Sequence, residues 1–279
     1  KYAIPLFSKS HRIIHWHYPG HGESSMPPDW DRTAISDLAH HLACVLDAAH
    51  VEPPFVLVGH SMGVQVILEY AVQNPTRPHA LIPICGSYGL VLDTFHGNGA
   101  LKMIQPYLQR FAERFPDVAG KIWRAAGASS LTYYGAILTE LNGDLMTPED
   151  ILPYVEHLQR LDPAFFARML GKAAEHTVER SLRSLTTPTL IIAAEHDSFT
   201  PYWLSERMHA LLPHSRLVRL PLGSHAAPIE LPDHMNLAIE DFLADISSRE
   251  AHRPEAASAR EAKCRPRAAA PVRESAKKS

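Results

Sequence analysis

The stretch that decides the fold is G-H-S-M-G at residues 59–63, which has Ser61 at its centre. An apolar run at residues 55–58 leads into this stretch, and an amphipathic helical pattern follows at residues 64–71. A serine on a tight turn between a strand and a helix takes a strained, exposed conformation. The residues two positions before and after it must therefore be small, and here both are glycine. We interpret Ser61 as a candidate nucleophile.

The residue after the serine would begin the predicted helix. The backbone N–H of Met62 then lies at the helix N-terminus. At that position an unpaired donor and the helix dipole both favour negative charge on a substrate oxygen. We therefore predict that Met62 supplies an oxyanion donor.

A serine hydroxyl is a weak nucleophile unless a base removes its proton and a carboxylate orients that base. The apolar run at residues 190–194 reads as a buried strand, and Asp197 lies in the polar loop after it. A second strand pattern at residues 216–220 leads into the loop that carries His225. Reactive groups collect at the carboxyl ends of strands in parallel α/β sheets. The predicted catalytic residues are therefore Ser61, Asp197 and His225.

Other assignments remain open for each of these residues. Asp93 follows the strand pattern at residues 80–85, and either Asp93 or Glu195 could provide the carboxylate instead. Asp197 could act only as a cap for a helix over residues 202–211.

The serine and the histidine have alternatives too. Ser61 could simply fill a tight turn. His225 is one of 18 histidines, but it is the one that lies in a loop after the last strand pattern. His60 beside the serine is expected to pack under the turn rather than to act as the base.

The order serine, aspartate, histidine resembles that of the α/β-hydrolase fold superfamily, and the resemblance covers residues 1–246. A further match is H-Y-P-G-H-G-E-S at residues 17–24, which resembles the loop after the family's fourth strand, D-x-[RP]-G-x-G-x-S. His17 stands where family members usually carry aspartate. The resemblance implies an α/β fold with a mostly parallel central sheet flanked by helices, an inserted helical cap, and no cofactor.

About a hundred residues separate the strand pattern at residues 80–85 from the next one, and a connection of that length must have structure of its own. In the superfamily, an insertion at this point is a helical cap over the active site. We therefore assign residues 1–88 and 186–246 to the core, residues 89–185 to the cap, and residues 247–279 to a disordered basic tail. Helices are expected at residues 31–50, 100–115 and 132–141, and at positions that follow Asp117, Thr147 and Asp162.

The first residues depart from the family pattern. Residues 2–7 and 12–16 resemble the family's first helix and fourth strand. Family members normally have three strands before this helix, and the given sequence begins at Lys1 without a counterpart of them. We therefore expect an incomplete N-terminus. Alternatively, residues 1–8 form a replacement strand, which Pro5 disfavours.

Aromatic residues of the cap favour a substrate with an apolar group. The predicted pocket residues are Phe95, Trp123, Tyr133, Tyr134 and Phe165. The alternative is that most of them pack the cap helices together.

Epoxide hydrolases and haloalkane dehalogenases share the capped architecture, but their nucleophile is an aspartate. Serine at position 61 therefore argues against both of these enzyme classes. Attack on an acyl carbon remains, and a carboxylic ester with an apolar acyl or alcohol group is the expected substrate. The alternatives are a thioesterase, a C–C bond hydrolase, a ligand-binding relative without turnover, and a poorly folded truncated product.

Composition sets the remaining bounds. A formal net charge of −3 gives no field that favours nucleic acid or a membrane surface. No apolar stretch approaches the roughly 20 residues of a membrane span. We expect a small-molecule substrate and a cytoplasmic location.

The cysteines, expected to be reduced, are Cys44, Cys85 and Cys264. No metal site is expected, and the histidines assigned a structural role are His11, His15, His17 and His21.

Overall fold

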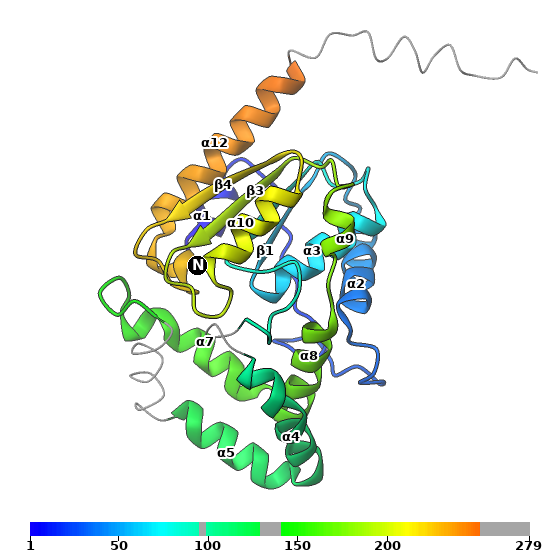
Figure 1. Ribbon diagram of the computed structural model, residues 1–279, viewed down its shortest axis with the longest axis vertical. Coiled ribbons are helices and arrows are strands. Elements are labelled where there is room, and N and C mark those ends of the chain that lie inside the picture. The colour runs from blue at the N-terminus through cyan, green and yellow to red at the C-terminus, as the bar shows by residue number, and fades with distance from the viewer. Residues whose placement is uncertain (95–98, 129–140, 252–279) are drawn as a thin grey trace, which may run out of the picture. The chain divides into compact units, whose positions relative to one another are not determined.

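The structure of the 279-residue chain is a computed structural model, and it describes residues 1–94, 99–128 and 141–251. Internal contacts divide the chain into two compact units, Lys1–Glu240 and Asp241–Ser279. The first unit contains a central β-sheet with helices around it (Figure 1). The residues assigned to the cap fall within this same unit.

The sheet has four parallel strands in the order β1-β2-β3-β4. Their bounds are Val56–His60 for β1, Ala80–Ile84 for β2, Thr189–Ala194 for β3 and Ser215–Leu220 for β4. In the register, Ile84 lies opposite Ile192, and Ile192 lies opposite Val218. The carboxyl ends of all four strands therefore meet at one edge, and the expectation of a mostly parallel α/β sheet is confirmed.

The described residues also form helices outside the long connection's main helices. They are α1 (Ala3–Phe7), α2 (Ile35–Ala48), α3 (Met62–Gln73), α9 (Glu179–Leu182), α10 (Tyr202–Leu211), α11 (Ala227–Glu230) and α12 (Pro232–Ala251). Helix α3 joins β1 to β2, and α10 joins β3 to β4. Because such crossovers are right-handed and the strand order follows the chain, α3 and α10 lie on the same face of the sheet (Figure 1).

The core lies between this sheet face and the helices. Leu38, Leu42 and Leu46 follow one another at four-residue spacing on α2, and all three are buried against α3 and its neighbours. On the sheet side, Leu81 and Ile191 are almost fully buried. The predicted sheet-covering helix within residues 31–50 is therefore confirmed.

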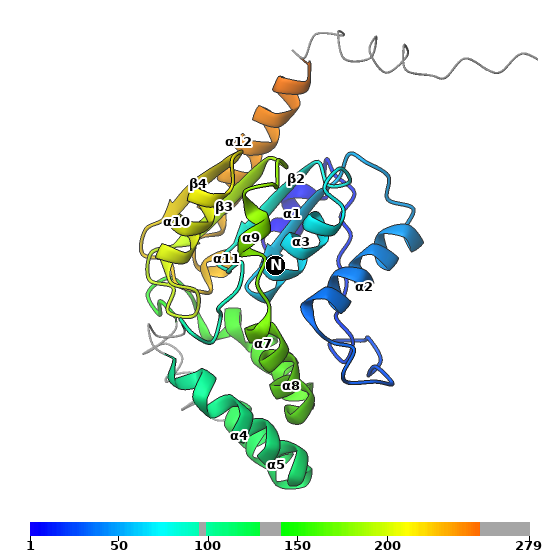
Figure 2. The same cartoon turned by 45° about the vertical axis from the view of Figure 1, so that its right-hand side comes forward.

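The long connection between β2 and β3 is helical. Its main helices are α4 (Ala100–Arg114), α5 (Pro116–Ala128), α7 (Pro148–Arg160) and α8 (Pro163–Glu175). The side chain of Asp162 caps α8 by accepting hydrogen bonds from the N–H groups of Ala164 and Phe165, each at 2.9 Å. Figure 2 shows these helices on one side of the sheet, with α4 and α5 farthest from it.

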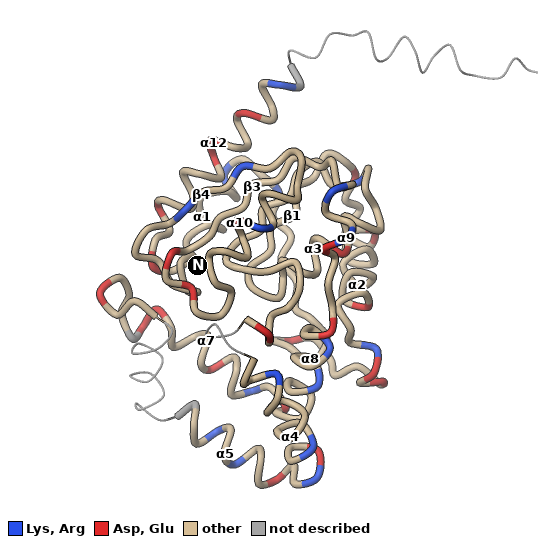
Figure 3. Tube along the Cα trace, in the orientation of Figure 1, with Lys and Arg blue, Asp and Glu red and all other residues tan. Residues whose placement is uncertain are grey.

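Side chains tie the cap helices to one another. Gln105 on α4 donates to the carbonyl of Ala167 on α8 at 2.7 Å. Trp123 on α5 donates from Nε1 to the carbonyl of Leu158 on α7, also at 2.7 Å. Acidic and basic positions are interspersed along these helices (Figure 3). The helices therefore support one another through directed hydrogen bonds as well as apolar packing.

The N-terminal segment differs in part from expectation. Residues 2–7 were expected to be helical, and α1 is found there. The expected strand over residues 12–16 is wrong, because the structure has no strand in that range. In the described sheet β1 pairs only with β2, and Val58 on it is 55% exposed. A β-strand exists only through a hydrogen-bonded partner, and the apolar pattern of residues 12–16 could not reveal whether one was available.

The boundary of the predicted tail also changes. Helix α12 continues to Ala251, so the predicted start of the tail at residue 247 is too early. The hydrogen bond from Ser247 to the carbonyl of Leu243, and the ion pair of Asp245 with Arg249 at 3.2 Å, lie in these last turns. The remainder of the predicted tail lies outside the described residues, as does nearly all of the helix expected at residues 132–141.

Leu81 in β2 provides a test of the core, because its exposed fraction is 0%. We expect Leu81→Ala to lower the free energy of unfolding by about 2–5 kcal/mol, through lost burial and the cavity that remains. Leu237→Ala is the matched control, since Leu237 is 59% exposed and the change should stay within about 0.5 kcal/mol. Urea unfolding measures both values, and equal losses would contradict the placement of Leu81.

Candidate active site

Ser61 lies on the turn between β1 and α3, with a left-handed backbone φ of 55°. This conformation is costly for a residue with a side chain, by about 1–3 kcal/mol. A Cβ on Gly59 would lie only 2.4 Å from the carbonyl oxygen of Gly63, so the chain can turn this sharply only with glycine at position 59. A Cβ on Gly63 would meet nothing nearer than the Tyr18 hydroxyl at 3.5 Å. Position 59, rather than position 63, therefore carries the strict steric requirement.

The structure brings the three predicted catalytic side chains together. Nε2 of His225 lies 3.0 Å from Oγ of Ser61, and Nδ1 of His225 lies 3.0 Å from Oδ2 of Asp197. An ionised carboxylate only accepts hydrogen bonds, so Nδ1 of His225 carries the proton. Nε2 is then free to accept the hydroxyl proton of Ser61.

The side chain of Asp197 is 1% exposed, and several donors hold it in addition to His225. Oδ1 accepts from the N–H groups of Phe199 at 2.9 Å and Thr200 at 2.8 Å, and Oδ2 accepts from the Thr200 hydroxyl at 2.8 Å. Burial by itself raises the pKa of Asp197. The hydrogen bonds and charge of His225, together with the bonds from Thr200, outweigh burial and lower the pKa below its ordinary value.

The alternative carboxylates bind other partners. Asp93 forms an ion pair with Lys102 at 2.6 Å, and Glu195 forms one with Arg219. Asp197 is the acid whose contact with His225 is seen in the structure.

Two neighbours of His225 support its orientation. The ring of Phe199 stacks on the imidazole, with ring centres 4.7 Å apart and planes at 23°. Nε2 of His60 donates to the backbone carbonyl of His225 at 2.9 Å. Desolvation of the His60 ring and the nearby charge of His225 lower the pKa of His60. Neither contact is predicted from the sequence, although His60 precedes Ser61 and Phe199 lies two residues after Asp197.

Met62 is the first residue of α3. The first N–H groups of a helix have no acceptor in a preceding turn. The backbone N–H of Met62 therefore meets the requirement for the predicted oxyanion donor.

The predicted pocket residues fall into two groups. Three of them lie outside the described residues: Phe95, Tyr133 and Tyr134. Trp123 packs against Phe166, with ring centres 5.4 Å apart, and Phe165 is fully buried, with its ring centre 5.3 Å from that of Trp30. A role for any of the five in substrate binding stays a prediction.

Two of the N-terminal histidines, His17 and His21, lie near a histidine of the cap. The ring of His157 on α7 is 6.2 Å from that of His17 and 5.9 Å from that of His21. Within residues 1–94, 99–128 and 141–251, no group of three or more potential ligands is arranged to hold a metal ion.

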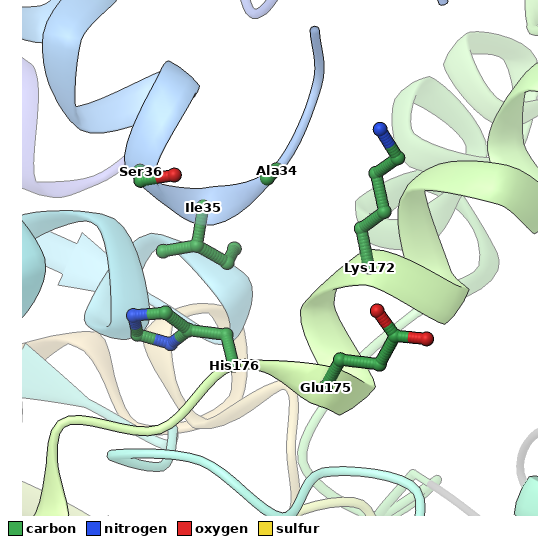
Figure 4. Close-up of a pocket in the computed structure, with 6 residues that line it drawn as sticks. All are labelled: Ala34, Ile35, Ser36, Lys172, Glu175 and His176. Carbon is green, nitrogen blue, oxygen red and sulfur yellow. The ribbon is translucent and has the colours of Figure 1, made fainter. Parts of the chain in front are cut away.

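A hollow of about 300 Å³ lies between the start of α2 and the end of α8 (Figure 4). Its lining residues are Ala34, Ile35, Ser36, Lys172, Glu175 and His176. Lys172 donates to the carbonyl of Asp31, and His176 binds the Glu69 carboxylate at 2.9 Å. Since none of the lining residues belongs to the predicted catalytic group, we assign no substrate to this hollow.

Comparison with known proteins identifies the family. A family model described as "alpha/beta hydrolase fold" matches residues 2–232, which is well over half of the chain. The chain therefore belongs to the α/β-hydrolase fold family.

Curated relatives match most of the chain. The uncharacterized hydrolase YugF of Bacillus subtilis is 28% identical over 245 residues, covering 86% of this chain and 83% of the relative. The putative carbamate hydrolase RutD of Klebsiella pneumoniae is 28% identical over 238 residues, covering 84% and 82%.

Solved structures resemble the fold. An esterase from Thermogutta terrifontis has a TM-score of 0.64 at 22% identity, covering 82% of this chain and 78% of that one. A bromoperoxidase from Bacillus anthracis has a TM-score of 0.70 at 19% identity, covering 87% and 86%.

None of the helices in the described ranges combines the length and hydropathy that a bilayer-crossing segment needs.

The two glycines of the turn provide a matched pair of variants. We expect Gly59→Ala to lower the free energy of unfolding by about 1–3 kcal/mol, because its new methyl group would clash with the Gly63 carbonyl. Gly63→Ala should leave stability close to that of the wild type. Urea unfolding of both variants measures the difference, and equal tolerance would contradict the geometry of the turn.

The lowered pKa of Asp197 predicts a pH dependence of stability. A carboxylate with a depressed pKa in the folded state stabilises the protein above the unfolded-state value of about 3.9, and this contribution disappears as the pH falls further. We therefore expect the wild type to lose more stability than Asp197→Asn between about pH 5 and pH 2. Denaturant unfolding of both proteins across this range tests the prediction. Parallel curves for the wild type and Asp197→Asn would refute it.

Proposed function

We propose that the chain is a serine hydrolase that cleaves an acyl bond through an acyl-enzyme on Ser61. The observation that carries the proposal is the 3.0 Å contact of Ser61 Oγ with His225 Nε2, combined with the contact of His225 Nδ1 with buried Asp197. This arrangement supplies a nucleophile, a base and a group that fixes the tautomer of the base.

In the first half of the reaction, Ser61 Oγ attacks the substrate carbonyl carbon as its proton passes to His225 Nε2. The carbonyl oxygen becomes an oxyanion, and the N–H of Met62 stabilises it. The protonated His225 then gives its proton to the leaving group as the bond to the acyl carbon breaks. The acyl group remains on Ser61.

In the second half, His225 takes a proton from water as the water oxygen attacks the acyl carbon. The new tetrahedral species collapses, and Ser61 Oγ leaves with the proton held by His225. The products are a carboxylic acid and the regenerated enzyme. The buried charge of Asp197 stabilises the imidazolium form of His225 during both halves.

A carboxylic ester of a small molecule, with an apolar acyl or alcohol group, is the first substrate candidate, and the five predicted pocket residues would contact that group. A thioester, or the C–C bond of a diketone, offers the same kind of acyl carbon. We place the reaction in the cytoplasm, and the mechanism needs no cofactor.

A carbamate is a second candidate. The observation that favours it is the match over 84% of the chain to a relative named as a putative carbamate hydrolase. A carbamate carbonyl carbon can undergo the same attack by Ser61, so one site could serve either substrate class.

Removal of the Ser61 hydroxyl tests the proposed nucleophile. We expect Ser61→Ala to lower kcat/KM by about 10⁴-fold or more, because the variant lacks the hydroxyl on which the acyl-enzyme forms. p-Nitrophenyl acetate and butyrate, a thioester and an aryl carbamate serve as substrates, with Ser36→Ala as a matched exposed-serine control.

Circular dichroism checks that both variants remain folded. Unchanged turnover in Ser61→Ala would overturn the proposal, and no turnover by the wild type on any of these substrates would favour a ligand-binding protein.

A further inference from the structure

Glu230 is a buried carboxylate beside the loop that carries His225. It lies at the end of α11 and is only 5% exposed. Its Oε2 accepts from the backbone N–H of Ser224 at 2.6 Å. Its Oε1 accepts from the Ser224 hydroxyl, and also from the backbone N–H of Asn142 at 2.8 Å. Three donors thus hold a charge whose burial would otherwise be costly.

Two of these bonds fix the chain next to His225. Ser224 comes immediately before His225, so its bonds to Glu230 set the direction in which the chain enters His225. The Ser224 hydroxyl oxygen also accepts from the N–H of Ala226, the residue after His225, at 3.2 Å. The backbone on both sides of His225 is therefore held through Ser224 and Glu230.

The third bond reaches the connection between β2 and β3. Asn142 precedes α7 and belongs to the segment assigned to the cap. Besides donating its N–H to Glu230, it donates from Nδ2 to the carbonyl of Leu222 at 2.8 Å. The segment that leads into α7 therefore contacts the histidine loop, residues 222–226, directly at Leu222 and indirectly through Glu230.

We propose that Glu230 is a positioning residue for His225 and that, with Asn142, it couples the cap segment to the catalytic histidine. This inference rests on the proposed function, in which His225 is the base. Glu230 does not contact the reacting atoms. It acts by holding the histidine loop so that His225 keeps its contacts with Ser61 and Asp197. A displacement of the cap segment would then be transmitted to the base.

A carboxylate suits this position better than an amide. Both oxygens of Glu230 accept from a backbone N–H, one from Ser224 and one from Asn142. An amide has one accepting oxygen, and its NH₂ group would face one of those N–H donors. Glu230→Gln therefore loses one anchor of the loop in either amide orientation, with almost no change of volume.

The first test compares Glu230→Gln with the wild type. We expect kcat to fall by about 10- to 100-fold with little change in KM, because a misplaced catalytic group slows the chemical step. The acidic limb of the pH–rate profile should also move, since the contact of His225 with Asp197 is loosened. Glu206→Gln is the matched control, because Glu206 is exposed on α10 and the charge change is the same.

An organophosphonate titration gives the concentration of competent sites, so that kcat is expressed per folded enzyme. A merely structural Glu230 would lower the melting temperature and leave that kcat and the pH profile unchanged. That result would overturn the inference.

The coupling to the cap segment has its own variant. Asn142→Asp keeps the size of the side chain but places a carboxylate against the carbonyl of Leu222. We expect kcat to fall, and we expect the double variant with Glu230→Gln to lose less than the product of the two single losses. Independent, multiplicative losses would refute the coupling. Should Glu230→Gln fail to fold, Asn142→Asp alone tests the coupling of the cap segment to His225, and an unchanged kcat would refute that coupling.

A measurement that does not depend on turnover distinguishes a failure of this inference from a failure of the proposed function. In ¹⁵N-histidine-labelled protein, the Nδ1–H resonance of His225 reports its contact with Asp197 whether or not any substrate is cleaved, and His225→Gln assigns it. We expect a downfield resonance in the wild type and in Glu206→Gln, and a shifted or broadened one in Glu230→Gln. An identical resonance in Glu230→Gln would overturn the positioning role, whereas absent turnover with the expected resonances would count against the proposed function alone.

Discussion

The close approach of Gly59 to the carbonyl of Gly63 is the constraint on which the site depends. It allows the chain to leave β1 and enter α3 through one residue, Ser61, held at a φ of 55°. A wider turn would move the serine hydroxyl away from the strand ends and remove Met62 from the first position of the helix. The strain at Ser61 is thus tied to both proposed catalytic features.

The parallel sheet supplies the second half of the geometry. Because the strands run in one direction, the loops after β1, β3 and β4 come to the same edge, and Ser61, Asp197 and His225 meet there. Local hydrogen bonds from Phe199 and Thr200 hold the side chain of Asp197. The His225 loop differs, because residues far away in the chain anchor it, namely Asn142 and His60.

Much of this site could be predicted from the sequence, since its signals are local. Ser61 sits between two glycines, and Asp197 and His225 each follow an apolar strand pattern. Contacts between distant residues were not accessible in this way. Glu230 reads as an ordinary acidic residue in a polar loop, and only the fold shows that it is buried against Ser224 and Asn142.

The wrong prediction at residues 12–16 has a related cause. Apolar residues in sequence report that a segment can be buried, whereas a strand also requires a neighbour with free hydrogen-bonding groups. Similarly, helix α12 passes the expected boundary at residue 247, and the i,i+4 ion pair of Asp245 with Arg249 in its last turns is a contact that composition does not show.

The most direct test of the account is intact-protein mass spectrometry after treatment with a fluorophosphonate, followed by peptide mapping. The account predicts one adduct per chain, located on Ser61, and none in Ser61→Ala. Reaction should slow strongly in a His225→Gln variant, because the hydroxyl then lacks its base. A folded protein that forms no adduct, or that carries the adduct on another residue, would contradict the assignment of Ser61 as the nucleophile.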